Sequence, residues 1–255
     1  MRLDDAVALV TGSARRVGRA ILLELAAAGA HVVVHNRAGG EEAERAAEEA
    51  RALGVDAAAF AADLADPDAI RDLFGAIRER FGRLDVLVNG AARFDAEPLE
   101  AVTAASWDAT MAVNLRAPLL CAQAAAPLMR RASRREGDAA LIVNVGDLSG
   151  IHPWRGYVQH GVSKAGLLHL TRILARELAP DIRVNALVPG AILPPPGMDD
   201  RGDAWQAVAR RVPLERTGEA SDVARAVRFL AESPFVTGAV LAVDGGEGLL
   251  GPVGH

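Results

Sequence analysis

The sequence predicts an α/β fold in which helices cover both faces of one parallel sheet of seven strands. Short runs rich in β-branched residues alternate with alanine-rich stretches of helical length along most of the 255 residues. Most of these short runs are apolar at every position, which is typical of strands whose two faces are both buried. Neither a linker nor an internal repeat divides the chain. We therefore expect residues 1–255 to form a single domain built on a doubly wound sheet.

Each predicted element follows from this alternation. The strands are expected, in chain order, at residues 6–10, 31–35, 55–60, 84–89, 140–145, 183–188 and 240–243. The helices are expected between them, at residues 17–28, 41–53, 67–80, 105–131, 158–178 and 221–231. Asp66 and Pro67 mark the start of the third helix, because an acidic N-cap and a proline at the first helical position both suit a helix N-terminus. At the last helix, Ser221 or Asp222 can serve as the N-cap.

The composition excludes several classes of protein. Hydrophobic residues make up 51% of the chain, which is too apolar for a disordered protein. The net charge of −5 gives no reason to expect nucleic acid or an anionic membrane as a partner. The lone cysteine, Cys121, excludes an intramolecular disulfide and a multi-cysteine site, and we expect no metal. Because the sequence has neither a signal-peptide pattern nor an apolar run of about 18 residues, we expect a cytoplasmic protein.

Two stretches stand outside the alternation. Residues 191–217 combine Pro194-Pro195-Pro196-Gly197 with a short predicted helix at 204–211. They follow the carboxyl end of a strand, where ligands bind in such sheets, so we interpret them as a flap over the substrate. The basic cluster at residues 130–135 ends a long helix, where the dipole favours cations, and is interpreted as a solvated helix end.

A glycine-containing turn joins the first strand to the first helix. The segment Thr11-Gly12-Ser13-Ala14-Arg15-Arg16-Val17-Gly18 has Arg16 in place of one of the usual three glycines. At a helix N-terminus, backbone N–H groups and the dipole favour a pyrophosphate. The second strand ends in His35-Asn36-Arg37, where an NAD enzyme usually has a carboxylate for the ribose 2′-hydroxyl. Because Asn36 replaces that carboxylate and the nearby arginines suit a 2′-phosphate, NADP(H) is favoured over NAD(H).

Taken in order, the motifs resemble the short-chain dehydrogenase/reductase family nearly from end to end. Beside the glycine-containing turn they comprise Asp63-Leu64, Asn89-Gly90-Ala91-Ala92, Asn114, Arg183-Val184-Asn185, Pro189-Gly190 and Val243-Asp244-Gly245-Gly246. The resemblance implies a Rossmann-type fold, a small-molecule substrate and a homotetramer formed through the long helices. It also implies cofactor contacts from Gly12, Ser13, Arg15, Arg16, Val17, Gly18, Asn36, Arg37, Asp63, Leu64, Asn89, Gly90, Ala91, Lys164, Pro189 and Gly190.

Within the family, the details are most similar to pteridine reductases. That group has arginine in place of the middle glycine, as at Arg16, and a basic residue shortly after the second strand. Most of the family has a catalytic serine 13 residues before a catalytic tyrosine, whereas pteridine reductases have aspartate. In this chain Asp147 lies 13 residues before His160, which itself stands where the family has tyrosine.

The resemblance implies a catalytic set of Asn114, Asp147, His160 and Lys164. Lys164 would hold the nicotinamide ribose, and it lies one helical turn from His160 on the same face. The histidine leaves three alternatives open. It is the general acid, because imidazole titrates near neutral pH; or Asp147 delivers the proton with a water; or the site binds the cofactor without turnover.

Substrate recognition is expected from Arg93, Phe94, Asp147 and Tyr157. The resemblance implies an aromatic residue near Phe94 that stacks on a pterin ring, whereas Tyr157 lies about two turns from Lys164, too far to replace the missing tyrosine. We therefore expect an NADPH-dependent reductase of a pterin, a dihydrofolate or a similar heterocycle. A short-chain carbonyl reductase and a catalytically silent NADP(H)-binding protein are the alternatives.

Overall fold

The predicted sheet is present in full. The computed structural model describes residues 1–136, 138–194, 199 and 202–250. Its strands are β1 (Val7–Val10), β2 (His31–Asn36), β3 (Ala57–Ala61), β4 (Val86–Asn89), β5 (Ala140–Val145), β6 (Ile182–Pro189) and β7 (Val240–Val243). All of them run parallel, in the order β3-β2-β1-β4-β5-β6-β7. The α/β class and the seven predicted strands are confirmed, with ends shifted by one or two residues.

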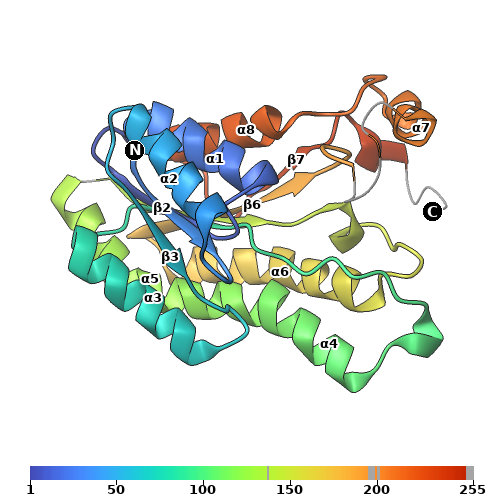
Figure 1. Ribbon diagram of the computed structural model, residues 1–255, viewed down its shortest axis with the longest axis horizontal. Helices are drawn as coiled ribbons and strands as arrows, with labels where there is room; N and C mark the ends of the chain where they lie inside the picture. The colour runs from blue at the N-terminus through green and yellow to red at the C-terminus, as the bar shows by residue number, and fades with distance from the viewer. Residues whose placement is uncertain (137, 195–198, 200–201, 251–255) are drawn as a thin grey trace.

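Helices cover both faces of the sheet, as Figure 1 shows. One layer holds α1 (Arg16–Ala27), α2 (Glu41–Ala52) and α8 (Ala220–Glu232), and the opposite layer holds α3 (Pro67–Phe81), α5 (Ala117–Glu136) and α6 (Val158–Glu177). In β1, Ala8 and Val10 pack in the core cluster beneath α1 and α8, whereas Val7 and Leu9 pack in the cluster beneath α3 and α5. Because neighbouring side chains point to opposite faces and both faces are buried, the strands are apolar throughout.

The predicted helix at 105–131 is not one regular helix. It consists of α4 (Ala104–Met111), a π-helical turn η2 (Ala112–Arg116) and α5. The π-helical turn carries Asn114, and such turns inside α-helices occur frequently at functional sites. Side-chain periodicity does not distinguish one π-helical turn from continuous α-helix, which is why the sequence predicted a single element.

The helix starts are partly as predicted. Asp66 is the N-cap of α3, and its carboxylate accepts a hydrogen bond from Asp68 N at 2.9 Å. The N-cap of α8 is Glu219 rather than Ser221 or Asp222, so that prediction was wrong by two or three positions. Asp222 contributes as the third helical residue, because its side chain accepts a hydrogen bond from Glu219 N and completes a capping box.

The stretch predicted as a flap is only partly described. It contains α7 (Asp203–Arg211), whereas Pro195, Pro196 and Gly197 lie outside the described residues. In the predicted solvated cluster at the end of α5, Arg130 forms a surface ion pair with Asp181 at 3.4 Å. Among the helices that the structure describes, none is long and apolar enough to span a membrane.

Candidate active site

A cleft opens at the carboxyl ends of β1, β2, β3 and β4. It has a volume of about 510 Å³ and is lined by Gly12, Ala14, Arg15, Arg16, Val17, Gly18, His35, Asn36, Arg37, Ala62, Leu64, Gly90, Ala91, Ala92, Arg93 and Val113. The order of the strands reverses between β1 and β4, and ligands bind at this switch point in doubly wound sheets. Ten of the residues predicted to contact the cofactor line this one cleft.

The glycine-containing turn is shaped as a close cradle. Gly12 has a φ of +72°, a conformation that side chains disfavour, and a Cβ on Gly18 would lie 2.4 Å from Gly12 O, so both positions favour glycine. Arg16, which replaces the middle glycine, has a φ of +55°, a conformation that costs a non-glycine residue about 1–2 kcal/mol. Its guanidinium donates a hydrogen bond to Pro194 O at 2.8 Å. Because the turn carries no side chains at Gly12 and Gly18, its backbone can approach a pyrophosphate at the start of α1.

The buried side chain of His35 supports the glycine-containing turn, a role that the sequence did not predict. Gly12 N donates a hydrogen bond to His35 Nδ1 at 3.1 Å, and His35 Nε2 lies 3.0 Å from Ala62 O, which can only accept. His35 is therefore neutral, with its proton on Nε2. Burial lowers the pKa of His35, and the hydrogen bond to Ala62 partly offsets that effect. From the sequence, this residue was expected only at the end of a strand.

The part of the cleft near β2 is basic. Arg15, Arg16 and Arg37 line it, and none of the described lining residues is acidic. Arg15 also lies 3.8 Å from the carboxylate of Glu42, in an exposed ion pair. Asn36 holds the following loop, because its side chain both donates to Gly39 O and accepts from Gly39 N. NADP(H), with a 2′-phosphate beside these arginines, is the cofactor that the cleft fits.

Six other predicted cofactor residues do not line this cleft. Ser13 is buried, and its hydroxyl accepts a hydrogen bond from His35 N at 3.1 Å. Asn89 donates to Asn144 Oδ1 at 2.8 Å, and Asp63 accepts from Ala65 N at 2.9 Å. Pro189 is the last residue of β6 and Gly190 follows it, whereas Lys164 lies on α6.

Helix α6 presents His160 and Lys164 on one buried face, as their spacing predicted. The ammonium group of Lys164 donates a hydrogen bond to Val145 O at 2.8 Å, at the end of β5. Burial lowers the pKa of Lys164, whereas the nearby carboxylate of Asp147 raises it. The lysine thus lies next to the other predicted catalytic groups.

Asp147 and His160 form a hydrogen-bonded pair. His160 Nε2 lies 2.7 Å from Asp147 Oδ2, and only 1% of the histidine is exposed, against 19% of the aspartate side chain. Ser149 donates to the other carboxylate oxygen through both its backbone N and its hydroxyl. Burial by itself raises the pKa of Asp147, but the hydrogen bond from His160 and the charge of Lys164 outweigh it and leave that pKa below its usual value.

Asn114 ties the site to the loop after β4. Its Oδ1 accepts from Arg93 N at 2.8 Å, and its Nδ2 donates to Arg93 O and to Ser163 Oγ, both at 3.0 Å. The asparagine is fully buried, so it acts on the site through these neighbours. Its place in the π-helical turn η2 aims it at α6.

Aromatic rings form the outer wall of the site. Phe94 is 47% exposed, and its ring centroid lies 4.9 Å from that of Tyr157 and 4.8 Å from that of His160. Trp154 extends the group, with its centroid 5.9 Å from that of Tyr157. Arg93, predicted to recognise substrate, forms an exposed ion pair with Asp95 at 2.7 Å.

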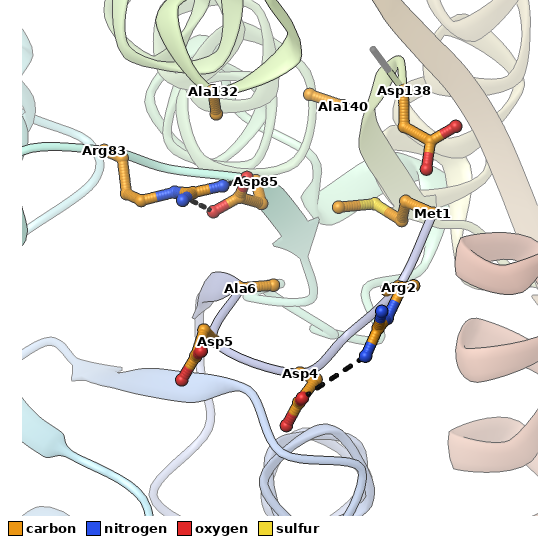
Figure 2. A pocket seen from close by; sticks show the side chains of 10 residues that line it. All are labelled: Met1, Arg2, Asp4, Asp5, Ala6, Arg83, Asp85, Ala132, Asp138 and Ala140. Atoms are coloured by element: carbon orange, nitrogen blue, oxygen red, sulfur yellow. Dashed lines mark hydrogen bonds and ion pairs between the residues drawn. The ribbon is translucent and has the colours of Figure 1, made fainter. Parts of the chain in front are cut away.

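A second cavity lies at the opposite end of the sheet and is shown in Figure 2. It has a volume of about 290 Å³ and is lined by Met1, Arg2, Asp4, Asp5, Ala6, Arg83, Asp85, Ala132, Asp138 and Ala140. Its lining residues lie before or at the start of β1, β4 and β5, and two ion pairs among them are local, Arg2 with Asp4 and Arg83 with Asp85. The predicted site residues all lie elsewhere, and most of them gather at the carboxyl end of the sheet.

Comparison with known proteins agrees with this geometry. A sequence model of the family described as enoyl-(acyl carrier protein) reductase matches residues 12–247. The 3-oxoacyl-[acyl-carrier-protein] reductase FabG of Staphylococcus aureus is 36% identical over 247 residues, which cover 94% of this chain and 96% of that protein. The chain belongs to the short-chain dehydrogenase/reductase family.

Solved structures of similar proteins superimpose on nearly the whole chain. A short chain dehydrogenase from Burkholderia cenocepacia J2315 in complex with NADP is 37% identical, with a TM-score of 0.87 over 97% of this chain and 99% of that one. FolM alternative dihydrofolate reductase 1 from Brucella canis, complexed with NADP, is 32% identical, with a TM-score of 0.87 over 98% and 96%. The family predicted from the sequence is confirmed, and the protein is an oxidoreductase of this family.

Proposed function

We propose that this short-chain dehydrogenase/reductase reduces a C=N bond in a planar heterocycle, such as a pterin or a dihydrofolate, with NADPH as the reductant. The observation that carries the proposal is the Asp147–His160 pair, which replaces the family's serine and tyrosine with two groups that can each hold a proton. A similar fold is present in FolM alternative dihydrofolate reductase 1, whose structure was solved in complex with NADP. Arg15, Arg16 and Arg37 support NADPH over NADH.

The two groups of the pair differ in what they can reach. His160 is enclosed by Asp147, Phe94 and the backbone of Arg93, so its ring has almost no surface left for a substrate. Asp147 retains an exposed edge. This difference favours Asp147 as the group that touches the substrate, with His160 behind it.

The neighbouring side chains support a flat substrate. The exposed face of Phe94, braced by Tyr157, offers an area on which an aromatic ring can stack. Bound NADPH would supply a hydride to the substrate carbon. Lys164 would bind the nicotinamide ribose, and Asp147 would hold the proton that the substrate nitrogen takes up.

A carbonyl reductase is the second candidate function. The 36% identity to a 3-oxoacyl-[acyl-carrier-protein] reductase favours it, because that relative aligns along nearly the whole chain. A ketone oxygen is far less basic than a ring nitrogen, so this reaction would ask more of the proton donor.

Oxidation of NADPH by the purified protein, followed by absorbance, separates the candidates. The proposal predicts turnover with a dihydropterin or dihydrofolate and little with 3-oxoacyl thioesters or simple ketones; the reverse order would establish the carbonyl reductase. Tight NADPH binding without oxidation by any substrate would point to the catalytically silent protein. The homotetramer implied by the family stays a prediction, which light scattering of the protein in solution tests.

A further inference from the structure

The ring of His160 lies between two hydrogen-bond acceptors. Its Nδ1 is 2.9 Å from Arg93 O, and its Nε2 is 2.7 Å from Asp147 Oδ2. A carbonyl oxygen can only accept, and an ionised carboxylate can only accept. Contacts this short need a proton in each of them.

The amide of Asn114 cannot supply the proton on the Nδ1 side. Its Nδ2 lies 3.4 Å from His160 Nδ1, but the two hydrogens of that group are used at 3.0 Å, one by Arg93 O and one by Ser163 Oγ. The amide cannot be turned round, because its Oδ1 accepts from Arg93 N. The proton between the ring and Arg93 O therefore belongs to His160 Nδ1.

With Nδ1 protonated, the contact with Asp147 needs a second proton. We propose that Asp147 and His160 hold one shared proton at neutral pH, resting on His160 Nε2, and that Ser149 directs its exchange to Oδ2 of Asp147. Two donors from Ser149 already fill Oδ1, so Oδ2 is the oxygen left to carry a proton. The low pKa of Asp147 agrees with a proton that rests on the histidine.

The other charged groups around the pair set limits on this arrangement. Lys164 lies on the same face of α6 as His160, and its charge lowers the pKa of Asp147. The same positive charge disfavours a cationic imidazole at His160. Arg93 is paired with Asp95 at 2.7 Å, and Tyr157 faces the ring of His160 at 6.2 Å between centroids. The carboxylate of Asp147 is thus the anion in contact with the imidazole among the described residues, and it compensates the ring's charge.

This inference rests on the proposed function for its role in turnover. Hydride adds to the carbon of the substrate's C=N bond, and the nitrogen takes the shared proton through Asp147 Oδ2. Asp147 is left as a carboxylate and His160 as a neutral imidazole that keeps its proton on Nδ1. His160 Nε2 and Asp147 Oδ2 are then two acceptors, 2.7 Å apart, with no proton between them. Because this contact is unfavourable, the pair takes up a proton from water.

Nuclear magnetic resonance of the protein labelled with ¹⁵N-histidine, without cofactor or substrate, tests the shared proton directly. The chain has six histidines, and the signals of His160 are those lost in His160→Gln. We expect both ring nitrogens of His160 to be protonated at pH 7. One unprotonated ring nitrogen at that pH would overturn the proposal, and this result is independent of whether pterins are substrates.

The pH dependence of kcat/KM for the best substrate tests the role of Ser149. Activity falls at high pH once the shared proton is lost, and Ser149→Ala removes one hydrogen bond to the carboxylate, which makes the pair hold its proton more tightly. We expect the alkaline limb to move up by about one pH unit in Ser149→Ala and to return in Ser149→Thr. His160→Gln should lose about 100-fold in activity at pH 7.

Ser221→Ala, on the exposed start of α8, is the matched control and should leave the pH profile unchanged. A Ser149→Ala profile that superimposes on that of the wild type would contradict the positioning role. Loss of activity with an unmoved alkaline limb would do so as well, because it would indicate only a structural defect.

Discussion

The two ends of the sheet hold similar ion pairs with different consequences. At the amino end, Asp85 accepts hydrogen bonds from Arg83 through both carboxylate oxygens, at 2.6 and 2.9 Å, and from Val7 N at 2.8 Å. At the carboxyl end, Asp147 accepts from His160 at 2.7 Å and from Ser149 N at 2.9 Å. Each aspartate is largely buried and has one cationic partner and one backbone donor.

The partner's chemistry distinguishes the two pairs. Arginine stays protonated at every relevant pH, so the pair of Arg83 with Asp85 is permanently charged and fastens the start of β4 to the start of β1. Histidine can gain and lose a proton near neutral pH, so the same geometry at the other end supports proton exchange. The Asp147–His160 pair lies at the carboxyl end of the sheet, beside the cofactor cleft. At this position the exchanged proton can serve the proposed reaction.

The largest expected effect is on turnover, from Asp147→Asn. An amide of the same shape cannot deliver the proton, so kcat should fall about 1,000-fold, whereas the thermal midpoint should change little. Steady-state kinetics and thermal melts of the same sample check both statements. Asp108→Asn, on the exposed side of α4, is the control, and equal losses in the two variants would contradict the role of Asp147.

The reciprocal change, Asp85→Asn, should affect stability and not catalysis. Arg83 would face an uncharged amide, at a cost of about 2 kcal/mol given its partial exposure. The thermal midpoint should fall by about 4–8 °C, with kcat at 25 °C unchanged. A loss of kcat in the folded variant would show that the two ends of the sheet are not independent.

A smaller effect is expected on cofactor affinity from Gly18→Ala. The new methyl group would lie 2.4 Å from Gly12 O, so the cradle must open, and NADPH should bind about tenfold more weakly in a fluorescence titration. Gly75→Ala in α3 is the matched control, because no atom lies within 4 Å of the added methyl group. It should leave the affinity unchanged and stabilise the helix slightly.

The smallest effect concerns pH and His35. Because burial lowers its pKa in the folded protein, the unfolded chain takes up a proton below about pH 6.5 while the folded chain does not. The contribution of His35 to the free energy of unfolding is fully present above pH 6.5 and is lost as the pH falls below 6.5. The thermal midpoint between pH 7.5 and 5.5 should therefore fall more steeply in the wild type than in His35→Asn, whose side-chain oxygen can still accept from Gly12 N.

The sequence was sufficient for the sheet and much of the cofactor cleft, because both depend on local patterns. Apolar runs flanked by helices predicted all seven strands, and Gly12, Gly18 and Arg37 were found from their places in short motifs. The pairing of Asp147 with His160 was anticipated only as a spacing of 13 residues. Their contact depends on how the end of β5 lies against α6.

The fold class, the family and many of the residues that line the cleft were thus predicted from the sequence alone, since periodicity and glycine positions act over a few residues. The tertiary structure decided what the substituted histidine can do. His160 meets Arg93, Asn114 and Asp147 from three different elements, and their hydrogen-bond roles together define its protonation. Such a count of donors and acceptors depends on distances between segments far apart in the chain, which no local pattern contains.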